Sequence, residues 1–268
     1  MSVRAQKGGK LPMKKGKWYV VAALFAAGGV FFPFAGKISA AAEAHPREKL
    51  SAYTTYFNEN EGGRCANIRL SASRIDGIAL QPFGEFSFNA TVGKRTAENG
   101  YQTAKIIAGG EFVAGVGGGV CQVSTTLYNA AILAGLEAIE VHAHSLSVGY
   151  VPPSRDAMVS SECDLRLFNP HTETVYFSLR VSTGAIQATV EGKDGGYVYS
   201  VQSKTLKTLP PPPPIVSAGD RDEVTRYPKD GLESEAYLST YRNGVLLSVK
   251  RLRKDSYAPL CGMQTKKP

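Results

Sequence analysis

The second half of the chain alternates between apolar and polar residues, the pattern of half-buried β-strands. Two such segments follow one another, separated by Ser182-Thr183-Gly184, which is typical of a tight turn. The alternation begins upstream, so we also expect a strand over 141–148. The sequence therefore predicts an antiparallel β-meander. Its inward positions are Val175, Phe177, Leu179 and Val181 on one segment and Ile186, Ala188 and Val190 on the next.

Two stretches before the meander have helical spacing. Cys65, Ile68, Ala72 and Ile75 share one helical face, and Asp76-Gly77 then turns the chain into an extended segment that reaches Phe88. A second helix begins at Cys121, carries apolar residues toward the core at Val123, Leu127, Ala130, Ala131 and Ala134, and ends near Gly135. The fold class is therefore α+β, with a helix that carries a cysteine at its N-terminus packed on the β-meander.

A run of five prolines, Pro210–Pro214, cannot donate backbone hydrogen bonds and is typical of an extended spacer. Beyond it, Asn243-Gly244 predicts a type I′ hairpin between 237–241 and 245–249. We expect a small β-rich C-terminal module over 219–268, a proline-rich linker over 206–218 and a main domain over 50–205.

The formal net charge of +8 is concentrated at the start of the chain. Residues 1–49 hold nine Lys/Arg and two Asp/Glu, whereas residues 50–268 hold 22 and 21. A domain that binds nucleic acid needs a basic surface of its own. The composition therefore gives no support for nucleic acid as a partner.

The basic residues precede an uncharged stretch, Trp18–Gly36, which small residues follow after Ser39. This order is typical of a secretory signal peptide, and the stretch could also just span a bilayer of roughly 30 Å. Residues 1–42 are thus predicted to be a signal peptide or an N-terminal membrane anchor. Both alternatives place the rest of the chain outside the cytoplasm, either secreted or anchored to the membrane at the cell envelope.

Six glycines lie within eleven positions directly before the second helix: Gly109, Gly110, Gly115, Gly117, Gly118 and Gly119. Cys121 follows them at the start of the helix, where unpaired N–H groups and the positive end of the helix dipole stabilise a thiolate. Cys121 is therefore a candidate nucleophile. Candidate substrate-binding residues are Gly117, Gly118, Gly119, Gln122, Ser124, Thr125 and Tyr150.

A nucleophilic thiol needs an imidazole partner, and the imidazole needs a group that orients it. His144 follows Cys121 in the chain, and the candidate carboxylates are Asp156 and Asp164. The sequence does not separate the two, although Asp164 is expected to begin a strand. Each could instead be a turn or capping residue.

Three other interpretations of these residues remain open. An exported cysteine is often half of a disulfide, and Cys65, Cys163 and Cys261 are also present. His142 and His144 could form a zinc pair with Cys121, but a lone His171 is a poor fourth ligand. The glycines could simply allow close packing. We expect no metal and no other cofactor.

Several ungapped motifs resemble those of the VanW-like family, named for an accessory component of glycopeptide-resistance clusters. They cover about residues 62–182. The motifs are Phe83-Gly84-Glu85-Phe86-Ser87-Phe88-Asn89, Gly93-Lys94-Arg95-Thr96, Gly117–Tyr128, His144-Ser145, Tyr150-Val151-Pro152-Pro153, Arg155-Asp156-Ala157 and Asp164-Leu165. The C-terminal module resembles, more faintly, a G5-type wall-associated module.

The resemblance implies a Gram-positive, extracytoplasmic envelope protein whose partners are the cell wall and, if the N-terminal segment is uncleaved, the membrane. Two functions are consistent with the residues. One is a Cys–His hydrolase or acyltransferase acting on peptide or amide bonds of peptidoglycan. The other is a non-catalytic envelope module that binds peptidoglycan or a partner protein.

Overall fold

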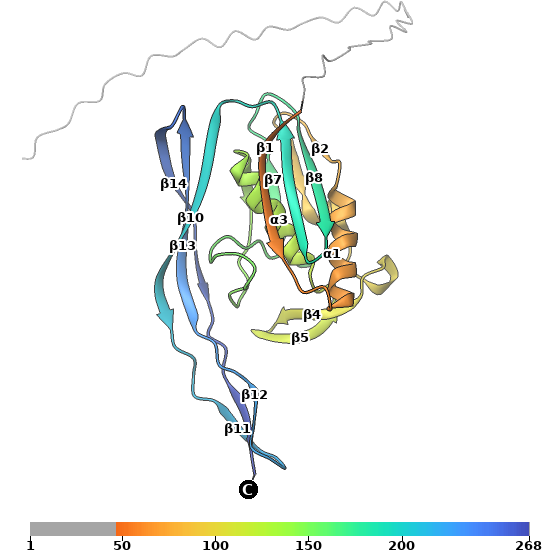
Figure 1. Ribbon diagram of the computed structural model, residues 1–268, viewed down its shortest axis with the longest axis vertical. Helices are drawn as coiled ribbons and strands as arrows, with labels where there is room; N and C mark the ends of the chain where they lie inside the picture. The colour runs from red at the N-terminus through yellow and green to blue at the C-terminus, as the bar shows by residue number, and fades with distance from the viewer. Residues whose placement is uncertain (1–46, 268) are drawn as a thin grey trace, which may run out of the picture. The chain divides into compact units, whose positions relative to one another are not determined.

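The alternating segments build the central sheet. In the computed structural model, which describes residues 47–267, β1 (Glu48–Tyr56), β9 (Ala185–Gly192), β8 (Val175–Ser182) and β2 (Ala79–Leu80) pair in that order, all antiparallel (Figure 1). Phe177 lies opposite Val190 and Leu179 opposite Ala188, so the apolar faces of β8 and β9 coincide. The predicted meander of these two strands is confirmed.

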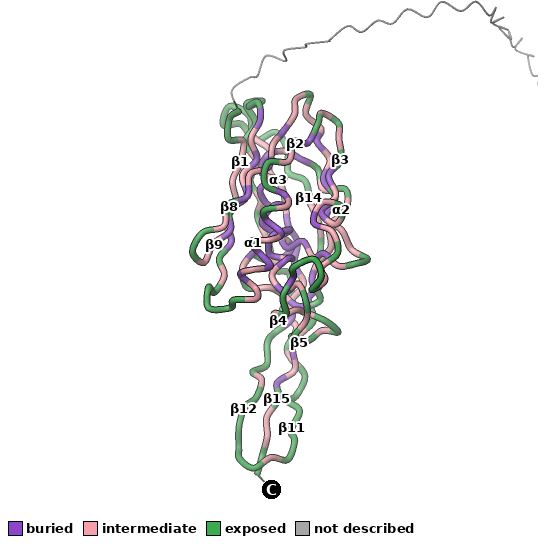
Figure 2. Tube along the Cα trace, turned by 90° about the vertical axis from the view of Figure 1, so that its right-hand side faces the viewer, coloured by how far each residue is buried: buried purple, intermediate pink, exposed green. Residues whose placement is uncertain are grey.

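Two helices cover this sheet. α1 (Gly62–Ile75) contacts β8, and α3 (Val120–Leu133) contacts β1 and β9 (Figure 1). α3 is buried almost all round, so its polar side chains need internal partners. Thr126 shares a 2.8 Å hydrogen bond with Thr55 of β1, for example. Figure 2 shows the buried residues gathered along these helices and strands.

Shorter elements surround α3. The β4–β5 hairpin closes one end of the domain, and β3, β7 and β6 form a separate small sheet. Their bounds are β3 (Glu85–Ser87), α2 (Phe88–Val92), a 3₁₀ turn (Ala97–Asn99), β4 (Thr103–Ala108), β5 (Glu111–Val116), β6 (Glu137–Glu140) and β7 (Arg166–Phe168).

The C-terminal part consists of two three-stranded sheets. β10 (Tyr197–Leu209), β13 (Gly231–Arg242) and β14 (Val245–Tyr257) are antiparallel, with β13 in the middle. The hairpin predicted at Asn243-Gly244 is confirmed, because both residues have positive φ, 52° and 77°. In the second sheet β15 (Met263–Lys266) lies between β11 (Ile215–Ala218) and β12 (Glu223–Arg226), and β11–β15 is a parallel pair.

The C-terminal strands begin earlier than the sequence suggested. Residues 197–209, divided in the prediction between the main domain and the linker, form β10, and only 210–214 of the predicted linker have no regular structure. The prolines explain this interruption, since they cannot donate to a strand ladder. Mostly antiparallel β-structure with few helices is confirmed as the fold class.

The strand expected over 141–148 is wrong. That segment belongs to a long irregular connection between β6 and β7, with one isolated bridge joining His142 to Met158. The predicted export signal lies outside the described residues. No helix within residues 47–267 has the length and apolarity needed to cross a membrane.

Candidate functional site

Three glycines place Cys121 at the start of α3. Gly117 and Gly119 have φ of 89° and 105°, conformations that other residues rarely adopt, and Gly119 is the N-cap of the helix. A Cβ at Gly118 would lie 2.5 Å from the Lys105 carbonyl oxygen, so this position has no room for a side chain. Cys121 is the second residue of the helix, and its thiol donates to the Val159 carbonyl at 3.4 Å.

The six glycines do not form one loop. Gly109 and Gly110 make the turn of the β4–β5 hairpin, and Gly115 lies within β5. The sequence shows only their proximity along the chain, whereas the hairpin separates them from the Cys121 turn. The glycine loop at the site is therefore Gly117–Gly119.

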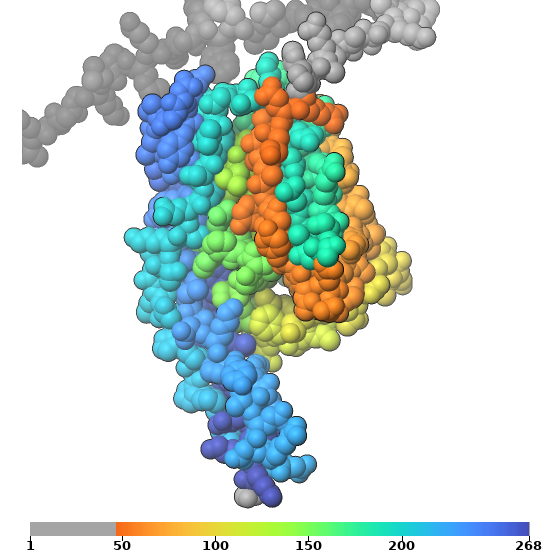
Figure 3. All heavy atoms as spheres, viewed as in Figure 1, coloured from red at the N-terminus to blue at the C-terminus, as the bar shows by residue number. Residues whose placement is uncertain are grey.

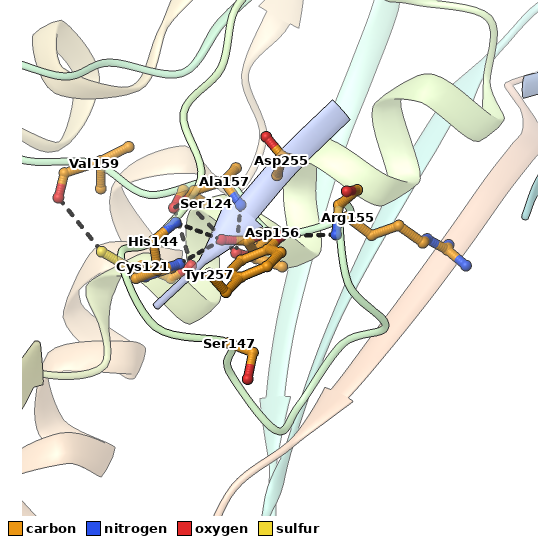
Figure 4. A network of polar contacts seen from close by, with 12 residues as sticks. Cys121, Ser124, His144, Ser147, Arg155, Asp156, Ala157, Val159, Asp255 and Tyr257 are labelled. Atoms are coloured by element: carbon orange, nitrogen blue, oxygen red, sulfur yellow. Dashed lines mark hydrogen bonds and ion pairs between the residues drawn. The ribbon is translucent and has the colours of Figure 1, made fainter. Parts of the chain in front are cut away.

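His144 and Asp156 form a buried pair beside Cys121. Asp156 Oδ2 accepts hydrogen bonds from both the backbone N–H and the ring Nδ1 of His144, each at 2.7 Å (Figure 4). The side chains are only 6% and 1% exposed. Because Nδ1 is bonded to the carboxylate, Nε2 is the ring nitrogen left for Cys121. The two hydrogen bonds fix the ring although His144 lies on an irregular segment.

The charges of the three groups reinforce one another. Burial raises the pKa of Cys121, but the hydrogen bond and positive charge of His144 outweigh burial, so the pKa lies below its ordinary value. Burial lowers the pKa of His144, but Asp156 and then Cys121 reverse this and raise it to about 9. Despite burial, His144 also holds the pKa of Asp156 below its ordinary value. The three groups thus favour the charged forms of one another, a thiolate and an imidazolium held by a carboxylate.

Asp164 lies at a different place. Its carboxylate accepts hydrogen bonds from the Ser87 hydroxyl and from the Asn89 N–H, the latter at 2.8 Å, at the start of α2. Its own backbone N–H donates to Glu140 at 2.9 Å. It precedes β7 by two residues rather than beginning it. Asp164 therefore organises the α2 turn, which is the capping role considered from the sequence.

Most of the predicted substrate-binding side chains of α3 have internal partners. Gln122 is 1% exposed and donates to Thr55 and to the Tyr56 carbonyl. Ser124 donates to the Ala157 carbonyl at 2.6 Å, and Thr125 accepts from the Ala157 N–H at 2.9 Å. Ser124 and Thr125 thus hold the residue next to Asp156. Their role is to position the Asp156 segment.

Tyr150 and the glycine loop do face a cleft. Its volume is about 1070 Å³, and Cys121, His144, Tyr150 and Gly117–Gly119 are among its lining residues. Burial raises the pKa of the Tyr150 hydroxyl, and the nearby Cys121 raises it further. In Figure 3 the surface is hollowed between the yellow β4–β5 hairpin and the neighbouring green chain.

The structure adds a residue that sequence reasoning missed. Tyr257, at the end of β14, is fully buried and donates its hydroxyl to Asp156 Oδ1 at 2.5 Å. The same hydroxyl accepts the Ser154 N–H at 2.7 Å. Arg253, also on β14, donates to the Asp156 carbonyl and is held by Asp255. Nothing local in the sequence marked Tyr257 and Arg253, because Asp156 lies 101 and 97 positions away from them.

The remaining histidines and cysteines are dispersed. His142 pairs with Glu140 at 3.0 Å, and His171 contacts the Ala134 carbonyl at 2.9 Å. Over residues 47–267 no three His, Cys, Asp or Glu side chains are grouped so that they could hold a metal ion. All four cysteines are free thiols. Cys121 therefore does not form a disulfide.

The comparisons with known proteins agree with the sequence motifs. Residues 63–191 match the family model described as "VanW like protein". The "Uncharacterized protein YoaR" of Bacillus subtilis (strain 168) is 41% identical over 167 residues, which make up 62% of this chain and 53% of that protein. The chain thus spans about half the length of this curated relative. The match over residues 63–191 confirms the resemblance to VanW-like proteins found in the sequence.

Two solved structures resemble the chain more distantly. They are "IgA1 Protease G5 domain structure", with 16% identity and a TM-score of 0.20, and "Crystal structure of HP0197-G5", with 11% identity and a TM-score of 0.15. They cover 27% and 25% of this chain and 89% and 96% of their own chains. Both titles name G5 domains, the module that the C-terminal part resembles in sequence.

Proposed function

We propose that the chain is a cysteine hydrolase or acyltransferase of the cell envelope that acts on peptide or amide bonds of peptidoglycan. The observation that carries this proposal is the Cys121–His144–Asp156 arrangement beside a large cleft, with the thiol pKa lowered by the imidazolium. Cys121 is half-buried and lines the cleft, and a charged thiolate there costs desolvation free energy that packing alone does not require.

The proposed reaction has two stages. The Cys121 thiolate attacks the carbonyl carbon and forms a C–S bond, while the carbonyl oxygen becomes an oxyanion at the positive end of the α3 dipole. The C–N bond then breaks, and the His144 imidazolium gives its proton to the departing amine. In the second stage neutral His144 takes a proton from water or from an acceptor amine, which attacks the thioester and releases Cys121.

Asp156 and Tyr257 act through His144 in this scheme. Asp156 fixes the ring and stabilises its positive charge, as an orienting carboxylate does. Tyr257 is a positioning residue, since its hydroxyl holds the second oxygen of Asp156.

The proposed location outside the cytoplasm rests on the N-terminal sequence and the family. A reporter enzyme that works only in the cytoplasm can be fused after Ala44. Activity of that fusion would contradict the proposed location.

Alkylation of the folded protein with iodoacetamide, followed by peptide mapping, tests the nucleophile. At about pH 6 Cys121 should react faster than free cysteine, whose thiol has a pKa of about 8.5 and is then almost fully protonated. Cys65, Cys163 and Cys261 are internal controls in the same molecule. Labelling of Cys121 only after denaturation would refute the proposal.

A Cys121→Ser variant separates catalysis from binding. Serine keeps the shape of the cleft but is a far weaker nucleophile than a thiolate. The variant should fold with an unchanged melting temperature and fail to restore function to cells that lack the protein. Full restoration would instead support the alternative, a non-catalytic module that binds peptidoglycan or a partner protein through this cleft.

A further inference from the structure

The cleft beside Cys121 is strongly basic although the folded part of the chain is nearly neutral. Residues 50–268 contain 22 basic and 21 acidic side chains. The cleft, in contrast, is lined by five Lys or Arg side chains and by one carboxylate, that of Glu61. Overall composition therefore does not explain the imbalance. The five basic residues are Arg64, Lys94, Arg95, Lys105 and Lys229.

The stems of two of these side chains pack against the glycine loop that precedes Cys121. A Cβ at Gly117 would lie 3.1 Å from the Cβ of Arg95, and a Cβ at Gly119 would lie 3.0 Å from the Cγ of Arg64. Larger residues in the loop would displace both arginine stems. The charge of Arg95 also contributes to lowering the pKa of Cys121, after the larger effect of His144. The loop thus brings two guanidinium groups to the start of α3.

Neither guanidinium is neutralised by a close carboxylate. Arg95 donates to the neutral Asn89 Oδ1 at 2.7 Å and to the Gly93 carbonyl at 3.2 Å, and no acidic side chain among residues 47–267 forms an ion pair with it. Arg64 donates to Gln122 at 2.7 Å, while its ion-pair contact with the half-exposed Glu61 is 3.8 Å long. Arg64 is 19% exposed and Glu61 48%, so solvent reaches the carboxylate and weakens this long contact.

We infer that this part of the cleft binds a carboxylate of the substrate, so that the peptide attacked by Cys121 is acidic close to the scissile bond. The inference rests on the proposed function and specifies its substrate class. Guanidinium groups match a carboxylate through paired N–H donors, which fixes orientation as well as charge. A cleft of about 1070 Å³ has room for several residues of such a peptide.

The arginines could instead serve only to stabilise the thiolate, and two alkylating reagents separate these roles. Iodoacetate and iodoacetamide both form an S–C bond with the thiolate and release iodide, but only iodoacetate carries a carboxylate. The ratio of their rates at Cys121 is independent of the thiolate fraction, because both reagents need the same thiolate. N-acetylcysteine supplies the reference ratio.

At low salt the iodoacetate-to-iodoacetamide ratio should exceed the reference by about tenfold, as expected for an anion in a cleft lined by positive charge. Arg95→Gln and Arg64→Gln should each lower the ratio toward the reference, and Arg95→Lys should preserve part of it. Arg180→Gln, an exposed change on β8, should leave the ratio unchanged. Salt should lower the ratio by screening. Melting curves establish that each variant is folded.

The outcomes are distinguishable. Failure of Cys121 to react with either reagent in the folded protein would refute the proposed function itself. Reaction with both reagents at the reference ratio would refute the carboxylate subsite and leave the nucleophile standing. A raised ratio that survives both Arg→Gln changes would overturn the assignment to Arg64 and Arg95.

Discussion

The domain over residues 48–192 and the C-terminal strands over 197–266 are stabilised in different ways. In the domain, α1, α3 and the central sheet enclose one continuous apolar core. In the C-terminal strands many apolar side chains are exposed, and besides Gly231 and Gly262 the buried residues are few: Ser234, Glu235, Ala236, Tyr257 and Leu260. Figure 2 shows the same contrast, with mostly exposed chain over β11 and β12.

The few buried residues of the C-terminal strands include those that contact the segment carrying Asp156. Ser234 shares a 2.7 Å hydrogen bond with Ser154, and Tyr257 bonds to both Ser154 and Asp156. The Ala258 N–H donates to the Ser145 carbonyl at 2.8 Å, beside His144. The domain therefore supplies the reacting side chains, whereas the C-terminal strands hold the irregular segment on which His144 and Asp156 lie.

The largest expected effect lies in the domain. Asp156→Asn removes the negative charge that raises the pKa of His144, so less thiolate forms at pH 6. One pKa unit corresponds to a tenfold change, and we expect alkylation of Cys121 to slow by about 100-fold. Glu235→Gln removes a buried carboxylate from β13 and serves as the control. If both changes slowed alkylation of Cys121 equally, the conclusion that the domain supplies the reacting side chains would be contradicted.

A substitution in the glycine loop should have the next largest effect. Gly118→Ala places a Cβ 2.5 Å from the Lys105 carbonyl oxygen and 2.8 Å from the Ala104 Cβ. We expect a loss of about 2 kcal/mol in the free energy of unfolding, measured by denaturant titration, because the backbone has to move. Gly195→Ala, before β10, would meet only an ordinary 3.4 Å contact and should cost far less. An unchanged stability in Gly118→Ala would show that the loop is pliable.

Tyr257→Phe measures how much the C-terminal strands contribute to the site. It leaves the Ser154 N–H without its acceptor and removes one donor from Asp156. A hydrogen bond contributes about 1 kcal/mol net, so Cys121 alkylation at pH 6 should slow by up to about tenfold. The pH at which alkylation is half-maximal should rise. Tyr227→Phe, at a 78% exposed position, is the matched control and should change neither quantity.

A last prediction concerns the pH dependence of stability. The pKa of His144 rises from its ordinary 6.5 to about 9 on folding, so its stabilising contribution is complete below about pH 6.5 and is lost as pH rises through 9. The stability difference between the wild type and His144→Gln should therefore shrink between pH 6 and pH 10 by up to about 3 kcal/mol, since one pKa unit corresponds to about 1.4 kcal/mol. Thermal melts at both pH values measure it. A difference that grows with pH would contradict the ion pair.

Local patterns in the sequence were sufficient for much of the fold. Alternation identified β8 and β9, helical spacing identified α1 and α3, and Asn243-Gly244 identified its hairpin. Each of these depends on neighbours within a few residues. The expected strand at 141–148 failed for a physical reason: the backbone N–H of His144 donates to the Asp156 side chain and not to a neighbouring strand. Alternation alone does not reveal such a partner.

The sequence indicated which types of residue make up the candidate site, but it did not show which of two aspartates belongs to it. Cys121 and His144 could be named from motif and chain order. Asp156 and Asp164 have similar surroundings in the sequence, and only the tertiary structure shows that one bonds His144 while the other caps α2. Arg64 and Arg95 were not among the candidate site residues, because their packing against the glycine loop depends on the path of that loop.

The position of Tyr257 in the chain has a consequence for the order in which the site matures. A chain is synthesised from its N-terminus, so Cys121, His144 and Asp156 all emerge well before β14. The hydroxyl that holds Asp156 arrives 101 residues later. A partly emerged chain therefore carries the thiol without the support that aligns its partners. The complete hydrogen-bond support of Asp156 therefore requires that β14 has closed onto the domain.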